Sequence, residues 1–335
     1  MNSIPKSPVF RLVCRIIHWM GHKKFYSQSG EEFWKSVRTQ RSSRGSAPSF
    51  FRRVCMKLLG ARFECKILGG HPVYFVRPRK FDGSCTILYL HGGGFVNEAV
   101  STHWNFLSWL LFQTRAQLVV PQYPLAPQAN VLDALPFLQT VYEHILENIP
   151  PEKIIVMGDS AGGNLTLTCG MLFREKDLPQ PRHLVMISPA LEMAAPDLNS
   201  DAEAREADAR DPMLSFGSFD TIFNAWRGTL PPEDWRVQPL FGDPKGLAPM
   251  TVFAGTNDIL CRSAERFFEK VRSLNAARAL PDERGSETSA SPEIPPIRLD
   301  FHRFPEMFHC WILIPMPESR KAREMLKRIV LDRNF

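Results

Sequence analysis

Residues 153–164 read KIIVMGDSAGGN, and this stretch decides the fold. Its apolar run, IIVM, ends at the sequence GDSAG, after which the chain continues as a helix-like segment. A strand that ends in G-x-S-x-G and passes directly into a helix forms a nucleophile elbow, a turn that holds a serine hydroxyl out at the carboxyl edge of a sheet. Gly158 and Gly162 fit such a turn, because a Cβ at either position would collide with the returning helix. Ser160 is therefore the predicted nucleophile.

A second glycine motif lies where another strand-like segment ends. Residues 88–95 read LYLHGGGF, within an apolar run that begins at Cys85. Acyl transfer builds negative charge on a carbonyl oxygen, and backbone N–H groups held in place beforehand stabilise that charge. We therefore expect an oxyanion hole formed by the N–H groups of Gly92 and Gly93 and by that of Ala161, which follows the serine. A phosphate-binding loop is disfavoured, because neither G-x-G-x-x-G nor G-K-[ST] occurs here.

The downstream sequence offers an acid and a base for this serine, in the chain order serine, acid, histidine. His309 stands in FPEMFHCW, just after the last strand-like segment, where a loop can bring its ring over the sheet edge. His302 lies inside that strand, and we interpret it as structural. Asp258 follows the apolar run MTVFAG, in a turn that opens a helix. Its carboxylate can accept the imidazole N–H and fix the tautomer, and a helix cap is the alternative role.

From about residue 62 the sequence alternates between strand-like and helix-like segments, a pattern typical of a mostly parallel sheet covered by helices. FECKIL and PVYFVRP predict an opening hairpin, and further strands are predicted at CTILYL, AQLVVPQ, KIIVMG, HLVMIS, MTVFAG and IRLDFHRF. Helices are predicted over residues 104–114, 131–147, 164–175, 260–276 and 318–331. The predicted fold class is α/β, with an eight-stranded, mostly parallel sheet flanked by helices.

Three regions interrupt this alternation. Residues 1–50 are helical and basic, and residues 191–235 combine a charged stretch with an aromatic one, so we expect both to cover the sheet as a lid. Residues 281–296 are rich in Pro, Ser and Glu and lack apolar periodicity, which predicts a flexible surface loop. The predicted organisation is therefore a set of N-terminal cap helices over 1–50 and a core over 51–335, in which 191–235 contributes to the cap.

Several motifs together carry a resemblance to a known family. HGGGF, GDSAGGN, DPMLS, FAGTNDIL and EMFHCW, in this order and spacing, resemble the hormone-sensitive lipase family of α/β-hydrolases, the esterases and lipases of α/β-hydrolase fold 3. The resemblance covers residues 62–333 and implies a carboxylic ester hydrolase with the triad Ser160, Asp258 and His309. It also implies a cap built from the N-terminal helices and the segment after the sixth strand. Glu306 departs from the family, in which a glycine is common at this place.

The predicted chemistry is a two-step acyl transfer on a small-molecule ester, with no metal and no organic cofactor. Short to medium acyl chains are expected, because the candidate walls of the substrate pocket are largely apolar. These walls are Phe95, Val96, Leu191, Met213, Phe216, Phe219 and Trp311. Two alternatives stay open: an amidase or deacetylase with the same triad, and a non-catalytic small-molecule-binding protein on the same fold.

The charge and the cysteine content of the sequence indicate which binding partners and which cellular compartment to expect. The chain has a net charge of +6 without a nucleic-acid-binding motif, so a solvated basic face is favoured over a nucleic-acid partner. The seven cysteines are odd in number, widely spaced and without a CxxC pair. This pattern predicts free thiols in a reducing compartment, and hence a cytoplasmic protein. The sequence does not indicate an oligomeric state.

The segment VFRLVCRIIHWM, residues 9–20, has the i, i+3, i+4 apolar spacing of an amphipathic helix. Arg11, Arg15 and His18 interrupt the run, so it is neither a secretory signal nor long enough to span a bilayer. The favoured interpretation is a helix packed on the body of the protein. A basic amphipathic helix lying on a membrane surface is the alternative.

Overall fold

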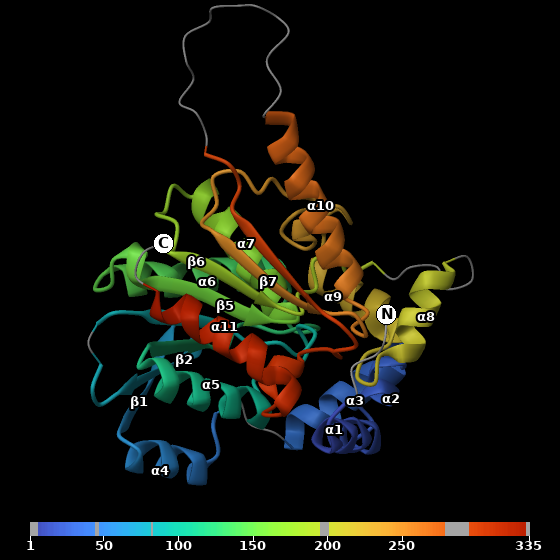
Figure 1. Cartoon of the computed structure of the whole chain (residues 1–335), viewed down its shortest axis with the longest axis horizontal. Helices are drawn as coiled ribbons and strands as arrows, with labels where there is room; N and C mark the ends of the chain where they lie inside the picture. The colour runs from blue at the N-terminus through green and yellow to red at the C-terminus, as the bar shows by residue number, and fades with distance from the viewer. Residues whose placement is uncertain (1–5, 44–46, 82, 195–200, 279–294, 333–335) are drawn as a thin grey trace, which may run out of the picture.

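An eight-stranded sheet forms the centre of the computed structural model, which describes residues 6–43, 47–81, 83–194, 201–278 and 295–332 (Figure 1). The strand order is β1-β2-β4-β3-β5-β6-β7-β8, and pairing is parallel from β4 to β8, whereas β2 is antiparallel to both of its neighbours. The bounds are Ala61–Leu68, His71–Pro78, Thr86–Leu90, Gln117–Pro121, Ile154–Asp159, His183–Ile187, Met250–Gly255 and Leu299–Phe304 for β1 to β8. The predicted fold class, with its mostly parallel sheet, is confirmed.

Helices cover both faces of the sheet, which is why its central strands are apolar throughout. In β3, Ile87 and Tyr89 point to one face and pack with α5 and α11, whereas Leu88 and Leu90 point to the other and pack with α6, α7 and α10. These helices are α5 (Ser101–Thr114), α6 (Val131–Leu146), α7 (Ala161–Glu175), α10 (Cys261–Arg278) and α11 (Arg320–Leu331). Each matches a predicted helix to within three residues at either end.

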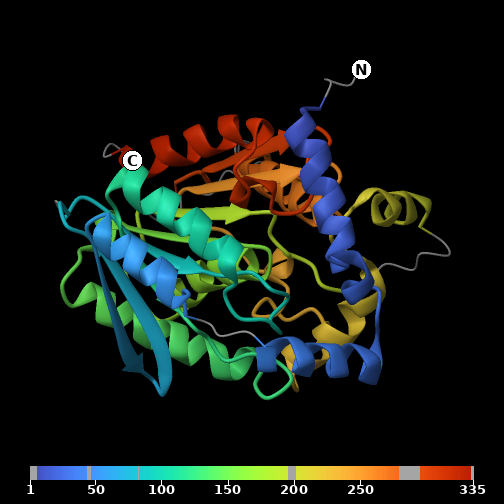
Figure 2. The same ribbon diagram turned by 90° about the horizontal axis from the view of Figure 1, so that it is seen from below.

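The N-terminal helices lie beside the helices that follow β6, as Figures 1 and 2 both show. A hydrogen bond of 2.9 Å joins the Gly30 N–H to Thr221 Oγ1, and Lys23 Nζ donates to the Asp211 carbonyl at 2.9 Å. The elements are α1 (Pro8–Trp19), α2 (His22–Tyr26), α3 (Gly30–Ser43), α8 (Ala202–Arg210) and α9 (Phe219–Arg227), and α4 (Phe50–Leu58) packs against β1. We refer to α1–α3, α8 and α9 as the cap.

Two predictions about the organisation of the chain stay predictions. The division into residues 1–50 and 51–335 remains a prediction, and residues 279–294, which include most of the predicted surface loop, lie outside the described part of the chain. Within the described residues, no helix combines the length and the apolar character needed to cross a membrane.

Candidate active site

Ser160 occupies the turn between β5 and α7 in a strained backbone conformation. Its φ of +54° and ψ of −120° are rare for a residue with a side chain, and such strain is typical of functional turns. The Ser160 N–H donates to the Ile187 carbonyl of the neighbouring strand at 2.9 Å. A Cβ on Gly158 would overlap the Gly162 carbonyl, as predicted, whereas one on Gly162 would overlap the Leu90 carbonyl of β3 rather than the helix.

Asp258 and His309 meet at the carboxyl edge of the sheet. Asp258 follows β7 and His309 follows β8, and His309 Nδ1 lies 3.0 Å from Asp258 Oδ2, with both side chains buried. Asp258 Oδ1 accepts the N–H of Leu260 at 2.9 Å. One carboxylate therefore fills both of the roles considered for it, because one oxygen binds the imidazole and the other caps the turn before α10.

Carboxylates around His309 control its protonation. Burial alone would lower the pKa of His309, but the charge and hydrogen bond of Asp258, with smaller contributions from Asp211 and Asp159, raise this pKa above its ordinary value. Asp211 itself is buried and accepts the N–H groups of Met213 and Leu214. Burial and the neighbouring Asp258 raise the pKa of Asp211 to about 7. The site is therefore built to hold a charged imidazolium.

This electrostatic arrangement predicts the pH dependence of hydrolysis. A base must be neutral to accept a proton, so kcat/KM should fall as the pH falls through the pKa of His309. Since that pKa is raised, the midpoint of the acid limb should lie above the ordinary imidazole value of about 6.5. A pH profile of p-nitrophenyl acetate hydrolysis measures it. A midpoint well below that value would contradict the described carboxylate surroundings.

Ser160 and His309 line the same cavity, which has a volume of about 420 Å³. Apolar side chains from α1, α2 and the segment after His309 provide much of its wall. They are Val13, Ile16, Ile17, Met20, Phe25, Leu313 and Ile314. We call this space the Ser160 cavity. The cap helices thus contribute directly to the surroundings of the nucleophile.

Most of the predicted pocket walls lie elsewhere. Met213 lines the Ser160 cavity, but the other six residues do not. Phe95, Val96, Leu191 and Trp311 are completely buried in the hydrophobic core, where Phe95 stacks on Trp226 at 4.2 Å between ring centroids. These residues were predicted as apolar walls of the substrate pocket, yet their side chains are buried in the core. The prediction for them is corrected accordingly.

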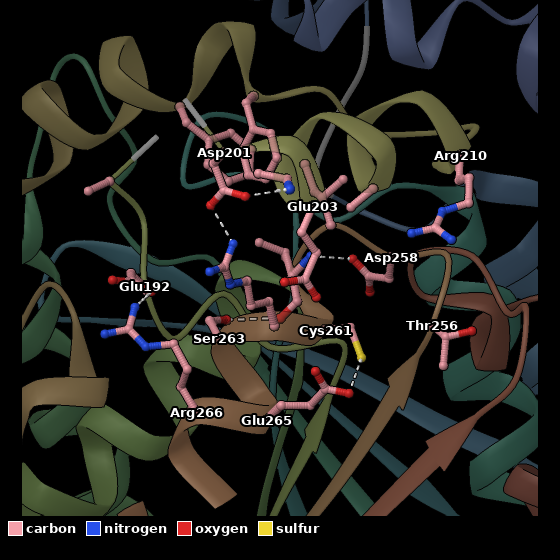
Figure 3. A pocket seen from close by; sticks show the side chains of 18 of the residues that line it. Glu192, Asp201, Glu203, Arg210, Thr256, Asp258, Cys261, Ser263, Glu265 and Arg266 are labelled. Atoms are coloured by element: carbon pink, nitrogen blue, oxygen red, sulfur yellow. Dashed lines mark hydrogen bonds and ion pairs between the residues drawn. The ribbon is translucent and has the colours of Figure 1, made fainter. Parts of the chain in front are cut away.

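Phe216 and Phe219 line a second cavity of about 310 Å³ that reaches Asp258 but neither Ser160 nor His309 (Figure 3). Charged side chains surround it, and Figure 3 shows Arg266 paired with Glu192. Arg262 pairs with Asp201 in the same way, and the Cys261 thiol lies 3.7 Å from Glu265. Its polar rim distinguishes this space from the largely apolar Ser160 cavity.

The glycine loop after β3 is tied to the residue before the nucleophile. The Gly92 N–H donates to Asp159 Oδ1 at 3.1 Å, and the Tyr89 hydroxyl donates to the same oxygen at 2.6 Å. His103 Nε2 lies 3.2 Å from Asp159 Oδ2. Burial would raise the pKa of Asp159, but these three partners lower it to about 2. Asp159 is therefore a buried carboxylate that holds the loop in place.

This bond corrects the predicted oxyanion hole. Because the Gly92 N–H already has an acceptor, it is not available to a substrate oxygen. The N–H groups of Gly93, Gly94 and Ala161 have no acceptor among the described residues. Positive φ angles of +121° at Gly93 and +63° at Gly94 are conformations that glycine adopts readily. These two glycines and Ala161 are the available donors.

Cys310 is a site residue that the sequence did not reveal. Its sulfur lies 3.3 Å from His309 Nε2 and 3.7 Å from Asp159 Oδ2. Burial and the nearby carboxylates raise the pKa of this thiol well above its usual range, so it stays protonated. Its position next to His309 was the only available signal. Neither this group nor any other set of described His, Cys, Asp and Glu side chains is arranged to hold a metal ion.

Comparisons with known proteins identify esterases and other hydrolases that are similar to this chain. The family model described as alpha/beta hydrolase fold matches residues 87–285. An esterase of Acinetobacter venetianus is 30% identical over 243 residues, which cover 68% of this chain and 77% of the relative. An acetyl-hydrolase of Streptomyces hygroscopicus is 27% identical over 254 residues, 75% of this chain and 76% of the relative.

Solved structures share the fold over nearly the whole chain. An esterase from the bacterial hormone-sensitive lipase family aligns with a TM-score of 0.73 and 20% sequence identity, covering 98% of this chain and 99% of the other. The family match extends over more than half of the sequence and includes both glycine motifs and Asp258. The chain thus belongs to the α/β-hydrolase fold family, as a hormone-sensitive-lipase-like member and a serine carboxylesterase-like hydrolase.

Proposed function

We propose that this carboxylic ester hydrolase works through a triad of Ser160, His309 and Asp258. Ser160 is the nucleophile, His309 the general base and acid, and Asp258 the residue that orients the imidazole and stabilises its charge. The observation that carries the proposal is the 3.0 Å contact between His309 Nδ1 and Asp258 Oδ2 beside a cavity that the strained Ser160 also lines. A purely structural role for His309 would not account for the strained turn that presents Ser160 to the same cavity.

In the first step Ser160 Oγ forms a bond to the ester carbonyl carbon and gives its proton to His309 Nε2. The substrate carbonyl oxygen becomes an oxyanion, which accepts hydrogen bonds from the N–H groups of Gly93, Gly94 and Ala161. The bond to the alcohol oxygen then breaks, and His309 returns the proton to the leaving alcohol. Before this transfer the Ser160 hydroxyl takes the place of the Cys310 thiol, which lies 3.3 Å from Nε2, as the group that donates to this nitrogen.

In the second step water takes the place of the alcohol. His309 Nε2 accepts a proton from the water molecule while the water oxygen bonds to the acyl carbon of the ester on Ser160. The same N–H groups stabilise the second oxyanion, and collapse of this intermediate breaks the bond to Ser160 Oγ. The acid leaves, and Ser160 regains its proton from His309.

The apolar wall of the Ser160 cavity favours esters with short to medium acyl chains. Ile17, Phe25 and Leu313 are buried or nearly so and offer no charged partner for a polar acyl group. The acetyl-hydrolase relative is consistent with the short end of this range. We expect kcat/KM on p-nitrophenyl esters to rise from acetyl toward butyrate or hexanoate, whereas a preference for a charged acyl group such as succinyl would contradict the proposal.

The same panel of esters tests catalysis against binding alone. If the fold served only to bind a small molecule, the purified protein would leave every ester intact while its melting temperature rose with some ligand. Hydrolysis by the wild-type protein, abolished by an active-site serine reagent, would support the proposal. Ester hydrolysis that survives such a reagent would argue against a serine mechanism.

A further inference from the structure

One face of α1 carries apolar side chains that lie open on the protein surface. From Val9 to Trp19 they are spaced three or four residues apart and so follow one another along the helix, and Met20 caps its end. Their exposed fractions run from 43% for Val9 to 85% for Trp19. We call this surface the α1 stripe, and it consists of Val9, Leu12, Ile16, Trp19 and Met20. A contiguous apolar surface of this kind indicates an interaction site more often than isolated exposed residues do.

The opposite side of α1 is fixed to the body of the protein, which gives the stripe a set direction. Ile17 is buried, and the Phe10 ring lies 5.6 Å from that of Phe308. At the start of the helix, the N–H and hydroxyl of Ser7 bond to the Glu318 carboxylate at 2.7 and 3.0 Å. Packing on the protein and contact with a surface are therefore compatible roles for α1, because they use different faces of the helix.

Positive charge is concentrated in the N-terminal segment of the sequence that contains this stripe. Residues 1–60 contain 12 Lys and Arg and 2 acidic side chains, a net charge of +10, so the remaining chain is net acidic at −4. Arg11 and Arg15 lie along α1 next to the stripe, are exposed, and form no ion pair with any described residue. The surface is thus apolar and basic at once, a combination typical of helices that bind anionic lipid surfaces.

A second helix on the same side of the molecule also carries exposed apolar and basic side chains. In α4, Phe50 and Leu58 are 76% and 81% exposed, and Arg53 and Lys57 are exposed beside them. Figure 1 shows α1 and α4 on the same lower side of the molecule, and Figure 2 shows this side from below. Two basic amphipathic helices on one side can contact a flat surface together.

The stripe continues into the active site. Ile16 and Met20 belong to the stripe and also line the Ser160 cavity. We propose that the α1 stripe, with its neighbouring arginines, docks on an anionic lipid surface, so that an ester dissolved in the lipid enters the Ser160 cavity directly past Ile16 and Met20. This inference rests on the proposed function for its substrate, a lipid-dissolved ester, but not for the docking itself.

Other occupants fit the surface less well. A second copy docked stripe to stripe would place two α1 helices together, each with the exposed Arg11 and Arg15 and without an acidic residue, which is repulsive. A nucleic acid would match the positive charge, but it would leave the apolar side chains of the α1 stripe exposed to water. An anionic lipid surface satisfies both the charge and the apolar side chains.

Flotation with lipid vesicles tests the docking. The inactive Ser160→Ala protein should float with vesicles of phosphatidylcholine and phosphatidylserine, should bind pure phosphatidylcholine more weakly, and should be released by salt. Adding Leu12→Gln and Trp19→Ser should weaken binding by about tenfold or more, because both side chains would insert into the interface. Arg11→Gln with Arg15→Gln should weaken the preference for anionic vesicles, because Arg53 and Lys57 on α4 keep their charge. Leu132→Gln, an exposed apolar position on α6, is the matched control and should bind unchanged.

Thermal melting and hydrolysis of a soluble acetyl ester, measured for the same substitutions with Ser160 intact, show whether the variants are folded. Folded Leu12→Gln/Trp19→Ser protein that binds vesicles as tightly as its parent would overturn the proposal, as would absence of binding to anionic vesicles. A dimer that depends on the stripe in solution without lipid would overturn it in favour of self-association. Because the flotation assay uses the Ser160→Ala protein, its result tests lipid docking independently of ester hydrolysis.

Discussion

Ser160→Ala should reduce kcat/KM for p-nitrophenyl butyrate by a factor on the order of 10³ to 10⁶ while leaving the protein folded. The hydroxyl is the group that forms the acyl bond, and no other described nucleophile occupies its place on the elbow. Cys310, whose thiol lines the same cavity, stays protonated and contacts His309 and Asp159. Residual hydrolysis would come from water attack in a site that still stabilises the oxyanion.

Steady-state kinetics with a purified, folded variant measures this loss. Ser108→Ala is the matched control, because Ser108 does not line the Ser160 cavity, and among the described residues its hydroxyl donates only to the Trp104 carbonyl within its own helix. The control should keep wild-type kcat and KM. Retention of more than about a tenth of the activity by Ser160→Ala would exclude this serine as the nucleophile.

Asp258→Asn should reduce kcat by about 10⁴-fold, because the amide can present an N–H where the imidazole N–H needs an acceptor. The ring would then turn or adopt the wrong tautomer, and Nε2 would no longer accept the serine proton. The loss of the carboxylate also removes the main influence that raises the pKa of His309. The acid limb of any remaining activity should therefore move to lower pH than in the wild type.

Combining this substitution with Ser160→Ala separates catalysis from folding. Residues that act as one unit are not additive, so the double variant should be no slower than Ser160→Ala alone. Asp300→Asn, a carboxylate on β8 outside the site, is the control and should keep its activity. A decrease in kcat of less than about tenfold in the Asp258→Asn variant would show that Asp258 is not the acid that orients His309.

The sequence predicted the fold well, because its signals were local and strong. The central strands β3, β5, β6 and β7 are apolar runs that end at turn residues, and every residue in them is buried, so the sequence pattern and the burial agree. The elbow was predictable for the same reason, since Gly158 and Gly162 leave room for backbone at positions where a Cβ would overlap a carbonyl. Chain order then sufficed to select Asp258 and His309, which the fold brings into contact.

The walls of the pocket and the oxyanion donors depend on contacts that no local pattern encodes. Whether Phe95 faces a substrate or Trp226 depends on α9, which lies over 120 residues further along the chain. The sequence does not distinguish Gly92 from the two glycines that follow it, whereas in the structure Asp159 accepts the Gly92 N–H. The part played by α1 was likewise undecided until the structure showed which of its apolar residues are buried and which are exposed.

Covalent trapping of the nucleophile tests the central claim most directly. A p-nitrophenyl alkylphosphonate should form a bond between phosphorus and Ser160 Oγ, with release of nitrophenolate, and mass spectrometry of the digested protein should find the adduct on the peptide that contains GDSAG. Activity should be lost in proportion to this labelling, and His309→Ala should label far more slowly. An active enzyme that carries the adduct on another residue, or that is inactivated without labelling Ser160, would contradict the account.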